Sequence, residues 1–281
     1  MAITSGIKFF KKSKCLFADG TGIIASSGDA GSKYAIDRNP ISYWRTVGGD
    51  DTVTDSLEIT FTADMTIDRI FLIDHNWKQF TVKYDVAGVW TDFTSVIGID
   101  GAKANISETT FADDTAYYEF ASVTTGKIQV TVTKTQIADQ QKYINQIIAT
   151  EEIGTLKGFP KIKNTEIDRN IRKKEMLSGK VLIQKSEESF KVDLDFQDYP
   201  GIAPYNADTD MIFGLHDRED NFIIWICGGR RGSAYFKKQM RGYRLKDVFT
   251  VQITAPIKVI YSDNIFQNSL NFTARMEEAV D

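Results

Sequence analysis

The sequence predicts a mostly β protein with two domains. Thr, Val, Ile, Phe and Tyr recur in short runs that Gly, Asp, Asn and Ser interrupt, which is typical of strands joined by turns. Several runs alternate apolar and polar residues, most regularly at 190–196, as expected for strands with one buried face. A length of 281 residues suits two ordinary domains better than one.

Composition narrows the class of protein. Hydrophobic residues make up 42% and charged residues 26%, which indicates a globular core, and a net charge of −4 argues against a general nucleic-acid binder. The sequence contains no run of 18 apolar residues, so we expect no membrane-spanning helix. The first residues lack the apolar stretch of a secretory signal. Cys15 and Cys227 are the only cysteines, so we expect no disulfide framework and synthesis in a reducing cytoplasm.

The first half contains recognisable pieces in a defined order. A polar loop at 35–45 comes first, followed by an alternating strand at 57–61 and an apolar segment at 65–70. A strand at 80–84 and a closing pair of segments complete the series. The first closing segment, 127–132, alternates clearly, whereas 137–148 has helical spacing in part and equally suits a strand from Tyr143.

In this order the pieces resemble the discoidin family, also called the coagulation-factor type C or galactose-binding-like jelly roll. The loop reads Ala-Ile-Asp-Arg-Asn-Pro-Ile-Ser-Tyr-Trp-Arg and matches the family pattern Ala-x-Asp-x-Asn-x-x-Ser/Thr-x-Trp. The resemblance covers residues 1–152, about half of the chain. It implies a β-sandwich jelly roll there, with Trp44 as a core residue rather than a sugar-stacking platform.

The same resemblance implies a candidate metal site. Some members of the family hold one structural Ca²⁺ in this loop, and the matching residues here are Asp37, Asn39, Ser42 and Glu151. Hard cations of this kind take six to eight oxygen ligands. The alternative is that Asp37 and Asn39 cap turns through bonds to backbone amides. No other cofactor is expected.

Family members that bind sugars use an aromatic ring with Arg, His or Asn on the loops at one end of the sandwich. His75, Asn76 and Trp77 follow a strand and are the candidate glycan-binding residues. Docking against protein neighbours is the use that we favour for this domain.

Residues 153–281 are expected to form a smaller, β-rich assembly domain. The charged stretch 153–175 has little β pattern and predicts a link or first loop. A hairpin from 178–183 and 189–196 follows, then a short helix at 208–215 and a buried strand at 222–227.

A basic segment with interleaved aromatic residues follows the buried strand. Arg and Tyr are favoured at interface centres, so we interpret it as an assembly surface. Binding of single-stranded nucleic acid is the alternative that we favour less. The residues concerned are Arg230, Arg231, Tyr235, Phe236, Lys237, Lys238, Arg241, Tyr243 and Arg244.

This half resembles β-rich proteins of bacteriophage tail tips and baseplates, through a strand ending in Gly-Gly-Arg, a basic loop and a closing strand at 247–252. The resemblance implies a structural component of the virion, made in the host cytoplasm and bound to other particle proteins and to copies of itself in a ring or symmetric assembly. The alternative function is a carbohydrate-binding protein that recognises surface glycans.

We expect no catalysis. The chain has two histidines, neither in a metal-binding motif, and lacks the Gly-x-Ser-x-Gly sequence of a nucleophile elbow.

Overall fold

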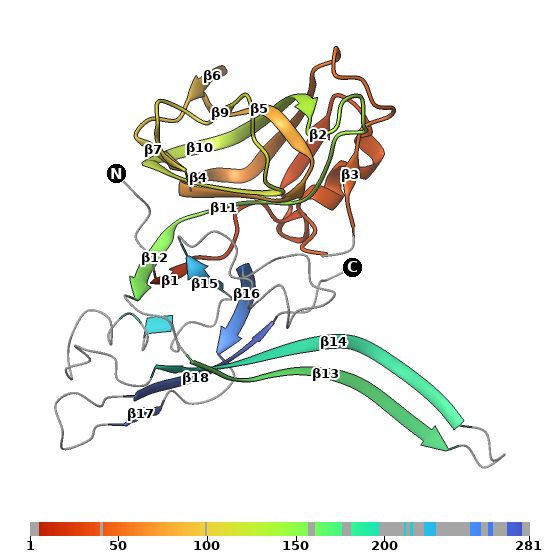
Figure 1. The fold of residues 1–281 in the computed structure, drawn as a ribbon, viewed down its shortest axis with the longest axis vertical. Helices are drawn as coiled ribbons and strands as arrows, with labels where there is room; N and C mark the ends of the chain where they lie inside the picture. Colours follow the sequence, from red (N-terminus) through yellow and green to blue (C-terminus); the bar gives the residue numbers. More distant parts are fainter. Residues whose placement is uncertain are drawn as a thin grey trace.

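The computed structural model describes residues 6–39, 42–98, 100–156, 161–175 and 181–196. It also describes residue 211 and residues 214–215, 222–228, 248–253, 258–260 and 269–276. These residues form two sheets of ten and eight strands. The predicted class, mostly β with a sandwich in the first half, is confirmed (Figure 1).

The first half is a β-sandwich jelly roll built on two strands of 21 residues, β4 (Asp55–His75) and β10 (Thr115–Thr135). The main path of its sheet runs β3-β11-β4-β10-β5-β6. Alternating burial along Asp55–Phe61 shows why this sequence forms a strand with one apolar face. The other strands are β2 (Gly22–Ala25), β3 (Trp44–Arg45), β5 (Trp77–Val86), β6 (Val89–Asp92), β7 (Val96–Gly98), β8 (Gly101–Lys103), β9 (Ser107–Glu108) and β11 (Tyr143–Thr150).

Two irregular stretches of register bend the long pair. The pairing of β10 with β4 shifts between Glu119 and Val123 and again between Thr125 and Lys127. Bulges of this kind increase local twist and let one strand change direction. Short 3₁₀ helices precede the long strands, η1 (Phe17–Asp19) and η2 (Asp29–Ala35).

Aromatic residues fill the core of the sandwich. Trp44 is fully buried, and its indole N–H donates to the Ser27 carbonyl at 3.1 Å. The indole rings of Trp44 and Trp77 meet edge to face, with centroids 6.5 Å apart. The interpretation of Trp44 as a core residue is therefore confirmed.

The second sheet has the order β12-β1-β15-β16-β18-β14-β13, with β17 on β18. Its strands are β1 (Gly6–Phe10), β12 (Glu152–Leu156), β13 (Lys161–Glu175), β14 (Val181–Phe196), β15 (Phe222–Gly228), β16 (Val248–Ile253), β17 (Lys258–Ile260) and β18 (Ser269–Met276). The stretch expected as a link at 153–175 therefore contains strand residues, which its charge-rich sequence conceals. The strand expected at 222–227 is confirmed.

Strand β1 joins the two halves of the chain. It lies between β12 and β15, so residues from the start of the sequence belong to the second sheet. The jelly roll is thus inserted between two paired strands, and the chain leaves and returns at one place. There the Lys11 N–H donates to the Glu151 carbonyl at 2.9 Å, and the Thr150 hydroxyl donates to the Lys11 carbonyl at 2.6 Å.

A cluster of apolar side chains packs between the two sheets. The Tyr117 ring on β10 lies 4.5 Å from the Trp225 ring on β15, and Phe71 on β4 lies 5.7 Å from Trp225. Both inner and outer faces of the jelly-roll sheet are therefore buried at this point. The members are Phe10, Phe71, Ile73, Tyr117, Ile148, Ile223 and Trp225.

A buried ion network lies beside this cluster. The Lys8 ammonium is 2% exposed and lies 3.0 Å from Glu119 and 3.5 Å from Glu152. The Arg69 guanidinium also binds Glu152. Burial alone would raise the pKa of Glu152, but the Thr155 hydroxyl and the charges of Lys8 and Arg69 outweigh burial and hold the pKa below its ordinary value.

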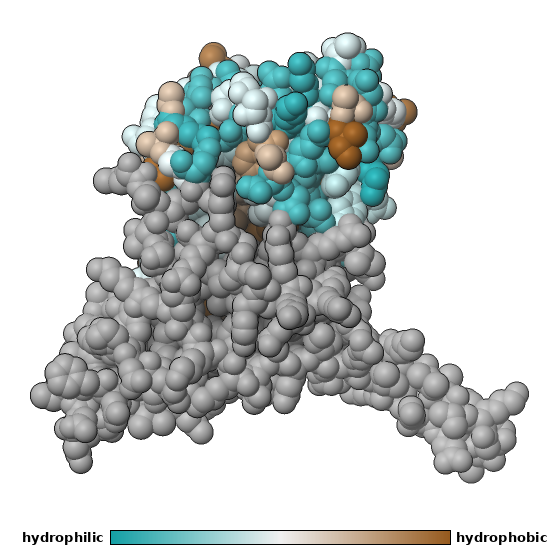
Figure 2. Space-filling view, viewed as in Figure 1, coloured by the Kyte–Doolittle hydropathy of each residue, from teal (hydrophilic) through white to brown (hydrophobic). Residues whose placement is uncertain are grey.

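The surface of the jelly roll is mostly polar on the face shown in Figure 2, where hydrophobic residues occur only singly or in small groups. Exposed hydrophobic side chains come from separate segments, such as Ile24, Val47 and Val89. In the part of the chain that the structure describes, no helix has the length and apolarity needed to cross a bilayer.

Replacing Trp44 should test the core. We expect Trp44→Ala to lower the free energy of unfolding by about 3–5 kcal/mol, because it removes a fully buried ring. Urea denaturation measures this. Val47→Ala, at a side chain that is 83% exposed, is the control and should change stability by less than about 0.5 kcal/mol. Equal effects for the two variants would contradict the core assignment.

Glu152→Gln should change how stability depends on pH. Because folding lowers the pKa of Glu152, its carboxylate stabilises the native state above the ordinary glutamate pKa of about 4.3, and this contribution is lost as pH falls through the folded-state pKa. The stability difference between wild type and variant should therefore shrink from pH 7 toward acid. Urea titrations across that range measure it, with Glu58→Gln as a surface control. A difference that stays constant with pH would refute the linkage.

Candidate functional site

The turn predicted to bind glycan lies inside the jelly roll. His75 and Trp77 are fully buried, and Asn76 is 5% exposed. A bound sugar cannot reach these side chains, so the turn does not present the predicted platform. The family pattern identifies the turn but not its direction, because a polar residue beside a strand can face either way.

The buried turn supports an aromatic stack that ends at the surface. The His75 ring lies 5.0 Å from the Trp77 ring and 5.4 Å from the Phe111 ring, and its planes are within 33° of both. The Trp77 N–H donates to His75 Nδ1 at 3.1 Å, which fixes the imidazole. Phe111 is half-buried, so one end of the stack reaches a surface pocket.

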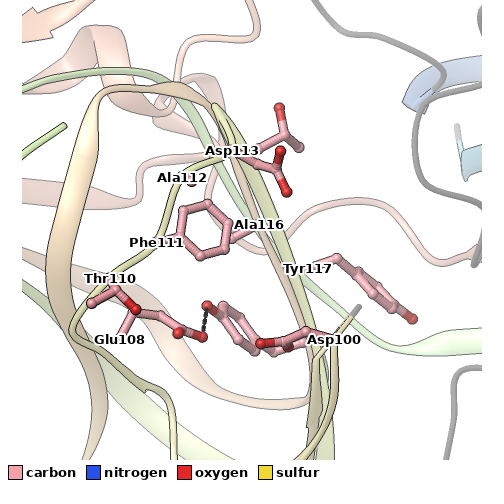
Figure 3. Close-up of a pocket in the computed structure, with 10 residues that line it drawn as sticks. Asp100, Glu108, Thr110, Phe111, Ala112, Asp113, Ala116 and Tyr117 are labelled. Carbon is pink, nitrogen blue, oxygen red and sulfur yellow. Dashed lines mark hydrogen bonds between the residues drawn. The ribbon is translucent and has the colours of Figure 1, made fainter.

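The pocket has a volume of about 150 Å³, below the roughly 300–1,000 Å³ typical of sites for drug-sized ligands. It therefore suits one small polar group. Figure 3 shows the Phe111 ring in the middle of the lining, with Asp113 on one side and Glu108 and Asp100 on the other. Hydroxyl groups of Thr110 and Thr115 complete the polar part of the lining.

Charges around the pocket are held in fixed positions. The Lys103 ammonium lies 2.8 Å from Asp100 and 2.9 Å from Glu108. The Tyr118 hydroxyl donates to Glu108 at 2.7 Å, and burial together with the Glu108 charge raises the pKa of Tyr118. The phenol is therefore a neutral donor at neutral pH. No described residue forms an ion pair with Asp113, which leaves this carboxylate at the rim able to accept hydrogen bonds.

A second aromatic group contacts the other side of the same turn. The Arg45 guanidinium lies 5.3 Å from the ring centroids of both Tyr43 and Tyr143. The Tyr43 hydroxyl donates to Asp74 at 2.6 Å. Asp74 has a φ of 50°, a left-handed conformation that is uncommon for residues other than glycine and often found at functional sites.

Asn76 positions the second tyrosine from inside the turn. Its side-chain oxygen accepts from the Tyr143 N–H at 3.0 Å, and its amide donates to the Gln141 carbonyl at 2.8 Å. Residues predicted as sugar contacts thus act as supports for side chains that reach the surface.

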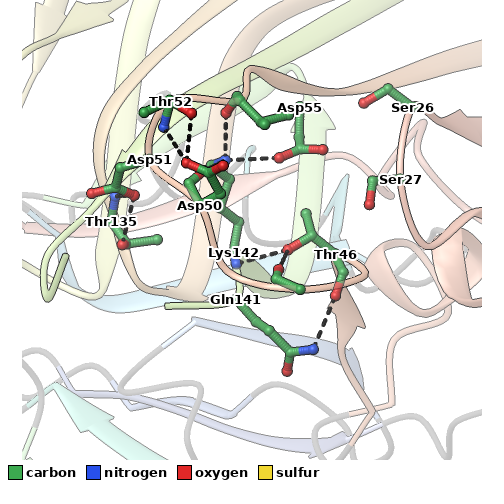
Figure 4. A network of polar contacts seen from close by, with 12 residues as sticks. Ser26, Ser27, Thr46, Asp50, Asp51, Thr52, Asp55, Thr135, Gln141 and Lys142 are labelled. Carbon is green, nitrogen blue, oxygen red and sulfur yellow. Dashed lines mark hydrogen bonds and ion pairs between the residues drawn. The ribbon is translucent and has the colours of Figure 1, made fainter. Parts of the chain in front are cut away.

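The loop at 46–54 is fixed by a buried lysine (Figure 4). The Lys142 side chain is 1% exposed and donates to the Asp50 carbonyl at 3.0 Å, the Val53 carbonyl at 2.6 Å and the Asp55 carboxylate at 2.7 Å. Three acceptors satisfy the three N–H bonds of the ammonium. The loop beside Tyr143 is therefore anchored from within.

The candidate calcium loop is closed by its own hydrogen bonds. Asp37 accepts from the Asn39 N–H at 2.9 Å and from the Ser42 hydroxyl at 2.7 Å. The Asn145 amide donates to the carbonyls of Asn39 and Ser42 at 3.1 and 2.6 Å, which places a donor where a cation would bind. Glu151 pairs with Lys11 at 2.7 Å instead.

Calcium binding by the four predicted residues stays a prediction, and their hydrogen bonds favour the alternative that they close the loop themselves. Among the described residues, no group of three or more His, Cys, Asp or Glu side chains could hold a metal ion. The turn-capping interpretation of Asp37 agrees with its contacts.

The predicted assembly surface lies outside the described residues, from Arg230 to Arg244, so its role stays a prediction. The aromatic surface residues were not predicted, although one signal was available. Tyr43 and Arg45 flank the core residue Trp44, and neighbours of an inward-facing strand residue point outward. Phe111 has no comparable signal in the sequence.

No protein-family model matches the sequence, and none of the curated proteins does. Among solved structures, the chitosan-binding module 1 of a chitosanase/glucanase from Paenibacillus sp. IK-5 is 15% identical, with a TM-score of 0.39, over 49% of this chain and 97% of that module. The family 32 carbohydrate-binding module of NanJ from C. perfringens, solved with galactose, is 15% identical, with a TM-score of 0.40, over 50% of this chain and 99% of that module. A pectin-binding carbohydrate-binding module is 16% identical, with a TM-score of 0.34, over 46% of this chain and 88% of that module.

Asn145→Asp should test whether the Asn145 side-chain amide takes the place of a Ca²⁺ ion in the loop. We expect the melting temperature of the wild type to be equal in EDTA and in excess Ca²⁺, because the Asn145 amide already binds the loop carbonyls. In the variant, a buried carboxylate would face two carbonyl oxygens, so melting should fall in EDTA and recover with Ca²⁺. Asn105→Asp is the control. A wild type that melts lower in EDTA would show that the loop does bind metal.

Proposed function

We propose that the jelly roll binds carbohydrate at the end of the sandwich formed by the Phe111 pocket and the Tyr43–Arg45–Tyr143 cluster. The observation that carries this proposal is the pocket with a half-buried aromatic ring and carboxylates on both sides of it. Several of the similar structures are described as carbohydrate-binding modules. For this chain the support comes from its own surface.

The chemistry of a sugar matches these groups. A pyranose has an apolar C–H face that packs on an aromatic ring and hydroxyl groups at its edge that both donate and accept hydrogen bonds. The Phe111 ring offers the first contact, and Asp100 and Asp113 accept hydrogen bonds from hydroxyls. On the other side of the turn, Arg45 supplies charged donors between two phenol rings.

Rigidity supports the same function. Binding a sugar orders few protein groups when the contacting side chains are already held in place, which preserves affinity. Phe111 is backed by His75, Tyr43 is held by Asp74, and the backbone of Tyr143 is held by Asn76. We infer a binding rather than a catalytic role for this surface.

Substitutions at the two aromatic groups test the proposal. A glycan array should first identify the saccharide that the wild-type chain binds, and calorimetry should measure its dissociation constant. Phe111→Ala should weaken binding by about tenfold, or 1.4 kcal/mol, because the stacking face is lost. Arg45→Ala should have an effect of similar size if one saccharide contacts both groups.

The matched control is Tyr34→Ala, at an exposed tyrosine that belongs to neither group. It should bind like wild type. All variants must melt within a few degrees of wild type for the comparison to count. Failure of the wild type to bind any glycan on the array, or unchanged binding by both Phe111→Ala and Arg45→Ala, would refute this function.

A further inference from the structure

Strands β13 and β14 form a long hairpin that extends beyond the second sheet. Figure 1 shows the pair reaching away from the other strands as a two-stranded ribbon. β14 pairs with β18 only over Lys191–Phe196. From Asp168↔Ser189 to Glu175↔Val181, the described residues of the two strands pair with each other alone. We call this part, residues 168–175 and 181–189, the arm.

A free arm of this kind has a thermodynamic reason to bind another strand. A two-stranded hairpin is marginally stable in water, whereas three or more strands with a packed face are stable. Both outer edges of the arm carry backbone N–H and C=O groups that no described strand pairs. Such edges are templates for strand addition, and β13 is also the last strand in the order of its sheet.

The two edges have opposite charge. Within the arm, the β13 segment contains four basic and two acidic residues, whereas the β14 segment contains one basic and two acidic residues. Opposite charges on adjacent strands stabilise pairing and like charges destabilise it. Two β13 edges would therefore repel each other, and a β13 edge is complementary to a β14 edge.

We propose that the arm joins copies of this chain head to tail, with the outer edge of β13 in one copy pairing with the outer edge of β14 in the next. The occupant of each edge is thus a second copy of the same protein. A heterologous contact of this type closes into a ring or continues as an open array, according to the rotation between copies. The inference is independent of carbohydrate binding.

Charge reversal on β13 is the first test. Arg172, Lys173 and Lys174 are opposite Gln184, Ile183 and Leu182 in the register of the hairpin, so replacing them by Glu places no two like charges directly opposite each other across the two strands. Sedimentation velocity over a range of concentrations should show that the wild type self-associates, more strongly at low salt. The triple variant should associate at least tenfold more weakly while melting like wild type.

A charge-swapped arm separates the proposed pairing from general disruption. This variant adds Arg169→Glu, Glu187→Lys and Glu188→Lys to the triple variant, which keeps residues 169 and 188 as an opposite pair in the hairpin register. Because both edges then exchange sign, association should return to the wild-type level. The control for net charge is Lys33→Glu, Lys78→Glu and Lys134→Glu on exposed positions of the jelly roll, which should associate like wild type.

Three outcomes would overturn the proposal. The wild type could remain monomeric up to its solubility limit, the triple variant could associate like wild type, or the charge-swapped arm could fail to restore association. Glycan binding by the same preparations reports separately on the jelly roll, so a failure of one proposal is distinguishable from a failure of the other.

Discussion

The pairing of β1 with β12 is the constraint on which the rest of the structure depends. These strands are neighbours in the second sheet, yet the whole jelly roll lies between them in the sequence. Both ends of the jelly roll are therefore fixed at one place, and Phe10 and Trp225 cover the outer face of its sheet. Domains joined by one flexible linker move relative to each other. Here two backbone connections, an apolar cluster and the Lys8 network resist such motion.

The candidate site shares a residue with this attachment between the two sheets. Tyr117 lines the Phe111 pocket and also packs against Trp225 on the second sheet. The pocket is thus built partly on a residue that the domain junction holds in place. A ligand bound in this pocket would therefore contact a residue that also packs against the second sheet.

Much of the fold could be predicted from the sequence, because the jelly roll follows from local patterns in a characteristic order. The loop at 35–45 ends in Trp44, which fills the core as the resemblance implies. The place of β1 could not be predicted, since its partners lie about 145 and 215 residues away and five residues carry no information about them. β13 was interpreted as a link because its charges conceal the alternation that identifies a strand.

The candidate site was only partly predictable for a different reason. The sequence identified the turn at 74–77 as special, but a sequence does not show which side of a sheet a polar side chain faces. His75 and Asn76 are buried because rings and backbone groups of the fold satisfy them, and that compensation appears only in three dimensions. Phe111 and Tyr143 are held in position by buried groups that contact them, the His75 ring and the Asn76 side chain, and these contacts cannot be read from the sequence.

Buried groups of the chain also stabilise two loops in which several carbonyl oxygens converge, near this end of the sandwich. Where several carbonyl oxygens converge, the fold needs a positive or hydrogen-bearing group to offset their repulsion. Lys142 supplies an ammonium to the loop at 46–54, and Asn145 supplies an amide to the loop at 37–42. Both groups belong to the chain: Lys142 immediately precedes β11, and Asn145 lies within it. Contacts within the chain therefore hold these loops and the neighbouring Tyr143 backbone in position.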